Sequence, residues 1–124
     1  MITEISTPKI KGPSEYVTIE GSFAPDNTDP PTDAKGRGYS VVRDDVGVFI
    51  VTFAQVGIDL VYADASLQME TGDGHYAQVG AYDADAKTLV IGLFDDSDAA
   101  DDLAADANTR IHFRVTFNQS DLLS

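Results

Sequence analysis

The chain contains no cysteine, has few basic residues and lacks any long apolar run. The lack of cysteine excludes disulfide bonds, thiolate metal sites and thiol catalysis. No stretch approaches the roughly 20 consecutive apolar residues that span a bilayer, and the first residues lack a basic start followed by an apolar segment. We therefore expect no membrane partner and no secretion signal.

Negative charge dominates the composition, with 21 acidic residues against 8 Lys or Arg and a formal net charge of −13. Such a charge opposes attraction to nucleic-acid phosphates, so we expect no nucleic-acid partner. The charge is uneven, because residues 44–109 hold 14 Asp or Glu and one basic residue, whereas residues 1–43 sum to −1 and residues 110–124 to +1. Two interpretations of the acidity stay open, hydration of a surface in a saline setting and attraction to a basic partner.

The length of 124 residues suits one domain. Residues 1–14 include Pro8 and Pro13 and show no apolar periodicity, so we interpret them as an extended N-terminal arm, with a disordered tail as the alternative. The remaining residues, 15–124, are expected to form a single β domain.

Clusters of β-branched and aromatic residues predict about seven short strands. The expected strands are residues 15–23, 38–43, 46–54, 63–70, 75–82, 87–94 and 110–118. This succession favours an all-β fold, an antiparallel β-sandwich or a jelly-roll-like barrel. Residues 24–36, rich in Pro, Asp and Thr, are expected to be a long exposed loop. Residues 46–54 are apolar at even and odd positions, which predicts a strand buried on both faces.

Residues 95–107 are interpreted as an exposed loop with at most a short turn of helix, because Asp is a poor interior helix residue. Six aspartates lie between residues 95 and 106, and carboxylates are the ligands of hard cations such as Ca²⁺. The known calcium-loop pattern is absent, since counting from Asp96 gives no glycine at the sixth place and no glutamate at the twelfth. We predict a solvated acidic loop, with no metal and no cofactor.

The only imidazoles belong to His75 and His112. No GxSxG elbow provides a serine nucleophile, and the two histidines do not form an HxxxH pair that could hold zinc. We therefore predict no catalytic residues and no enzymatic activity.

The last strand alternates most clearly, since its odd positions from 111 to 117 are apolar. Arg110, His112 and Arg114 share the opposite face, about 6.6–7 Å apart along the strand. Two interpretations stay open, a stripe that docks a partner and ion pairs with the chain's own acids. The candidate partner-binding residues are Lys9, Lys11, Lys35, Arg37, Arg110, His112 and Arg114.

Four segments carry a resemblance: GSFAPDNT at 21–28, KGRGYSVVRDDVGVFIVTFA at 35–54, YAQVGAYDADAKTLVIGLFD at 76–95 and ANTRIHFRVTFNQSDL at 107–122. They resemble the capsid decoration, or cement, proteins and the related head-fibre proteins of tailed bacteriophages. The strand-pair pattern V-x-R-x-x-x-G-x-[FY]-x-V-T reads here from Val41 to Thr52. The closing-strand pattern reads from Asn108 to Ser120, with Gln119 inserted before Ser120 as a departure.

The resemblance implies a non-enzymatic viral structural protein on the outer surface of a phage head. It implies a homo-oligomer, commonly a trimer, that binds the major capsid protein and stabilises its lattice. Production in the cytoplasm of the host bacterium and residence in the virion would follow. The same β pattern leaves two alternatives open, a phage tail or fibre component and a glycan-binding, adhesin-like domain.

Overall fold

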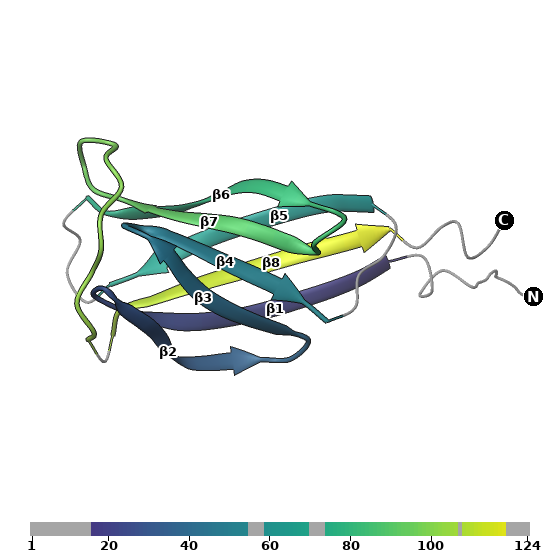
Figure 1. Ribbon diagram of the computed structural model, residues 1–124, viewed down its shortest axis with the longest axis horizontal. Helices are drawn as coiled ribbons and strands as arrows, with labels where there is room; N and C mark the ends of the chain where they lie inside the picture. Colours follow the sequence, from purple (N-terminus) through teal and green to yellow (C-terminus); the bar gives the residue numbers. More distant parts are fainter. Residues whose placement is uncertain (1–15, 55–58, 70–73, 107, 119–124) are drawn as a thin grey trace, which may run out of the picture.

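The computed structural model describes residues 16–54, 59–69, 74–106 and 108–118. These residues form two stacked antiparallel sheets of four strands each (Figure 1). The strands are β1 (Tyr16–Asp26), β2 (Asp29–Gly36), β3 (Tyr39–Asp45), β4 (Val48–Phe53), β5 (Asp59–Gln68), β6 (Tyr76–Asp83), β7 (Thr88–Phe94) and β8 (Arg110–Asn118). The expected all-β sandwich is confirmed, and none of the described residues lies in a helix that could span a membrane.

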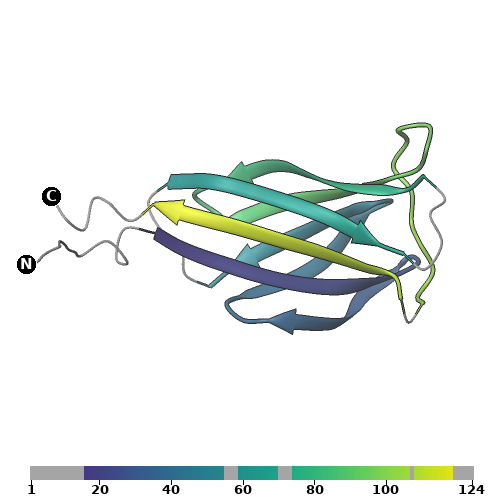
Figure 2. The ribbon, with the colours of Figure 1, turned by 180° about the vertical axis from the view of Figure 1, so that it is seen from behind.

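The first sheet has the strand order β2-β1-β8-β5, and the second has the order β3-β4-β7-β6. The two sheets meet at their edges, where β2 lies beside β3 and β5 beside β6. Figure 2 shows the first sheet from its outer side, with β8 between β1 and β5. The segment that joins β7 to β8 crosses one end of the sandwich, and β1 begins and β8 ends at the opposite end (Figure 1).

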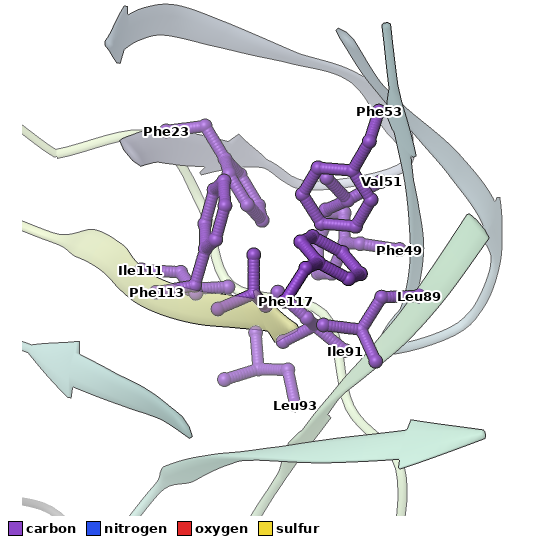
Figure 3. Packing of buried hydrophobic residues seen from close by; sticks show 11 residues of the cluster. Phe23, Phe49, Val51, Phe53, Leu89, Ile91, Leu93, Ile111, Phe113 and Phe117 are labelled. Atoms are coloured by element: carbon purple, nitrogen blue, oxygen red, sulfur yellow. The ribbon is translucent and has the colours of Figure 1, made fainter. Parts of the chain in front are cut away.

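The core lies between the inner faces of the two sheets and is built mainly from aromatic and branched side chains (Figure 3). The predicted alternation of β8 is confirmed, because Ile111, Phe113, Val115 and Phe117 are all buried. Phe113 also contacts Phe53 of the second sheet, with ring centroids 6.4 Å apart. Burial of these side chains provides the main driving force for stacking the sheets.

Two expectations about strands were wrong. The structure has eight strands, because residues 29–36 of the expected loop pair with β1 as an edge strand. Pro30 and Pro31 lack a backbone N–H, and such residues are tolerated where one side of a strand has no hydrogen-bonded neighbour. Strand β4 buries Phe49, Val51 and Phe53 on one face only, while the other face is half-buried or exposed.

A close contact between the sheets centres on Gly21, which lies on the inner face of β1. A Cβ atom at this position would lie 2.4 Å from Cε1 of Tyr39 and 2.8 Å from Cζ of Phe113. The Tyr39 and Phe113 rings meet edge to face, with centroids 4.8 Å apart. The Tyr39 hydroxyl donates to the Ser22 carbonyl oxygen at 2.9 Å and to that of Lys35. Tyr39 therefore joins β3 to both β1 and β2.

Candidate functional site

The outer face of the first sheet carries the arginines that the sequence singled out. The Arg110 side chain is 13% exposed and already has partners within the chain. Its Nε donates to Oγ of Ser22 at 2.8 Å, its Nη1 donates to Oδ2 of Asp33 at 3.0 Å, and its Nη2 donates to the Asp33 carbonyl oxygen. Arg110 thus holds the edge strand β2 against β1.

Arg114 and His112 lie further along the same face and also have partners. Nε of Arg114 donates to Oε2 of Glu20 at 2.8 Å, in an exposed ion pair. Asp64 lies opposite Arg114 on the other neighbouring strand. His112 Nε2 lies 2.8 Å from Oε1 of Gln68. The intramolecular pairing that the sequence left open is present for both arginines, and partner binding by these residues stays a prediction.

The other candidate residues are distributed differently. Lys35 is the register partner of Ser22, which is also paired with His112, so Lys35 lies in the same row of the first sheet. Arg37 lies in the connection between β2 and β3 and is exposed. Lys9 and Lys11 belong to the expected arm, which lies outside the described residues. The structure therefore brings four of the seven candidates onto one sheet face, together with acidic neighbours.

A shallow, open depression of about 380 Å³ lies on this face. The residues that line it include Glu20, Tyr62, Asp64, His112 and Arg114. Tyr62 is 48% exposed, so one aromatic ring stands beside several hydrogen-bonding groups. The depression can offer a polar ligand both donors and acceptors.

The acidic segment between β7 and β8 is attached to the second sheet by an ion pair. Nε and Nη2 of Arg43 donate to Oδ1 and Oδ2 of Asp102 at 3.1 and 2.8 Å. The backbone N–H of Gly47 also donates to Oδ1 of Asp102 at 3.0 Å. The hydrogen bond from Arg43 lowers the pKa of Asp102, with a smaller contribution from Gly47, against an opposing effect of burial. The same hydrogen bond raises the pKa of Arg43.

Several other aspartates of this segment also have structural partners. Asp101 Oδ2 lies 2.9 Å from Nε2 of His75, and the Tyr76 hydroxyl donates to Oδ1 of Asp98 at 2.7 Å. Oδ1 of Asp95 accepts from the backbone N–H of Ser97 and from that of Ala99. In the described parts of the chain, no three His, Asp or Glu side chains are grouped so that they could hold a metal ion. The expected loop is thus a braced segment in which carboxylates complete turns.

Among the described residues, the outer face of the second sheet has charged side chains only at its ends, where Asp45 lies opposite Val48 and Asp83 opposite Thr88. We call it the uncharged face, and it comprises Ser40, Val42, Val48, Ile50, Thr52, Thr88, Val90, Gly92, Phe94, Tyr76, Gln78 and Gly80. Val42 is 54% exposed, whereas the Phe94 ring stacks on Tyr76 with centroids 5.3 Å apart. The sequence analysis missed this face because apolar residues at both even and odd positions of β4 were interpreted as burial on both sides.

Comparison of the chain with protein-family models, with curated proteins and with solved structures found no match.

Proposed function

We propose that this protein is a non-enzymatic capsid decoration protein, which binds the outer surface of a phage head and stabilises the lattice of the major capsid protein. The observation that carries the proposal is the uncharged face on a chain of net charge −13. Exposed apolar area without charge is typical of a surface that contacts another protein. The outer face of the first sheet instead mixes exposed apolar side chains, such as that of Tyr62, with the ion pairs of Arg110 and Arg114.

The two motifs of the resemblance coincide with the β3–β4 hairpin and with β8, which supports the proposal. The Val41–Thr52 motif forms the hairpin of β3 and β4, and this hairpin supplies Val42, Val48 and Ile50 to the uncharged face. The second motif contains β8, which lies between β1 and β5 and provides four core residues. The motifs therefore specify both the sandwich and one of its outer surfaces.

A capsid lattice presents many copies of one binding site, so weak individual contacts can give stable attachment when the bound protein is oligomeric. We accordingly propose a homo-oligomer, in the form of a trimer, bound to the major capsid protein. Residence on the virion and synthesis in the cytoplasm of the host bacterium belong to the same proposal. The acidic surface would oppose aggregation of decorated particles through mutual repulsion.

A second candidate function is binding of a host glycan by a tail or fibre component. The depression on the first sheet favours it, because Tyr62 offers a ring face beside the polar groups of Asp64 and His112. A glycan array distinguishes the two functions, since a decoration protein needs no sugar ligand. Selective binding of one glycan class that is lost on replacing Tyr62 with Ala would favour the second candidate.

The test of the main proposal is addition of the purified chain to undecorated phage heads. Binding should saturate at a fixed number of copies per head and raise the temperature at which the heads release DNA. Heads already covered by their own decoration protein provide the control and should bind no further chain. Absence of saturable binding together with unchanged heat resistance would refute the proposal.

A further inference from the structure

The uncharged face has acidic residues at both of its ends. Asp44 and Asp45 lie where β3 ends, next to the turn that leads into β4. Asp83 and Asp85 lie at the other end, at the turn between β6 and β7, where the exposed Lys87 offsets one of the two negative charges. All four aspartates are exposed, while the strands between them present Val42, Val48, Ile50 and Val90. The face is thus an apolar strip bounded by carboxylates.

We propose that this face binds a protein surface of complementary pattern, with an apolar centre and Lys or Arg residues at its two ends. Opposite charges at the ends of an interface speed association and fix its orientation, and apolar contact at the centre supplies affinity. The inference rests on the proposed function in that the partner surface would belong to the major capsid protein.

A second copy of this chain fits the face less well. Four strands about 4.8 Å apart and about six residues of 3.3 Å each give a footprint of about 400 Å². Each partner in a stable interface buries about 800 Å², so an isolated complex through this face alone would be weak with either partner, and only attachment to a repeating lattice tolerates weak single contacts. A dimer formed through this face would also bring together the carboxylates at the ends of the two copies. Charge complementarity therefore favours a partner with basic ends.

Replacing Val42 with Glu tests the face with a matched control. Val42 is 54% exposed on the second sheet, and Val61 is 55% exposed on the first, so Val61→Glu introduces the same group at equal exposure elsewhere. On undecorated heads, Val42→Glu should weaken binding at least about tenfold, while Val61→Glu should bind like the wild type. If the wild type binds and the two variants bind with equal affinity, the proposed role of this face would be overturned, while the decoration function would stand.

A second probe tests the face without phage heads, so that failure of the proposed function stays distinguishable. We would titrate the protein with a synthetic amphipathic peptide whose leucine face is flanked by lysines, and with the same peptide carrying glutamates instead. The lysine peptide should shift the amide signals of β4 and β7, and Val42→Glu should weaken this binding although it adds negative charge. Shifts confined to the first sheet, or equal shifts with both peptides, would overturn the proposal.

Two further measurements test other occupants of the same face. Sedimentation that shows a wild-type dimer lost in Val42→Glu would identify a second copy as the occupant and overturn the proposed partner. Deletion of residues 1–14 that shifts the β4 and β7 signals of the free protein would identify this segment as the occupant, with the same consequence. We expect the wild type and Val42→Glu to sediment alike, and we expect the deletion to leave the β4 and β7 signals unchanged.

Discussion

Arg43 and Asp102 lie 59 residues apart in the chain and form a bidentate ion pair, with Nε–Oδ1 at 3.1 Å and Nη2–Oδ2 at 2.8 Å. Their side chains are 17% and 11% exposed, so the pair is largely shielded from water. It attaches the acidic segment before β8 to the hairpin of β3 and β4. Removing one partner leaves the other charge poorly solvated and unpaired, which destabilises more than the intact pair stabilises.

The first prediction concerns Asp102 itself. Asp102→Asn should lower the free energy of unfolding by about 1–3 kcal/mol, because it weakens hydrogen bonds from a charged donor and from a backbone N–H. Asp96→Asn, an exposed change in the same segment, should shift it by less than about 0.5 kcal/mol. Urea unfolding of the two variants checks this, and equal losses would contradict the structural role of the ion pair.

The second prediction follows from the lowered pKa of Asp102. A carboxyl with a lower pKa in the folded protein stabilises the fold above its unfolded pKa of about 3.9. That contribution is lost as the pH falls through the folded pKa. The stability difference between the wild type and Asp102→Asn should therefore be constant near neutral pH and shrink below about pH 4. Urea midpoints from pH 7 to pH 2 measure it, and a difference independent of pH would contradict the assignment.

The third prediction concerns the contact between Gly21 and Tyr39. Gly21→Ala should destabilise the protein by about 1–3 kcal/mol, because the added Cβ would overlap the Tyr39 ring. The same substitution should cost less in a Tyr39→Leu background, where part of the ring is absent. A double-mutant cycle by urea unfolding checks this coupling, and additive effects would show that the overlap is relieved elsewhere.

The fourth prediction separates the two arginines of β8. Arg110→Ala should destabilise the protein by about 1–3 kcal/mol, because Arg110 is largely buried and bonds both Ser22 and Asp33. Arg114→Ala should change stability by less than about 0.5 kcal/mol, because its pair with Glu20 is exposed. Head binding by Arg114→Ala should match that of the wild type. A large loss of binding would instead favour the docking stripe that the sequence suggested.

The sequence predicted the sandwich well where periodicity was strong. The alternation of β8 correctly assigned its buried face, because each inward position carries a large apolar side chain. Strand β2 was missed because its prolines and aspartates favour turns locally. Its pairing with β1 and the bonds from Arg110 to Asp33 come from residues far away in the chain. Local propensity does not contain that information.

The candidate site was predicted only in part for a similar reason. Periodicity placed Arg110, His112 and Arg114 on one face but could not show which acids of neighbouring strands lie beside them. The strand register does show it, since Glu20 and Asp64 lie opposite Arg114 on the two neighbouring strands. The apolar residues at both even and odd positions of β4 gave a signal for the uncharged face. A sequence does not distinguish a buried apolar face from an exposed one, however.

The most direct test of the proposed function is the number of chains bound per undecorated phage head, measured for the wild type, Val42→Glu and Val61→Glu over a range of concentrations. We predict saturable, stoichiometric binding of the wild type and of Val61→Glu, with at least about tenfold weaker binding of Val42→Glu. Failure of the wild type to saturate the heads at any concentration would contradict the proposed function.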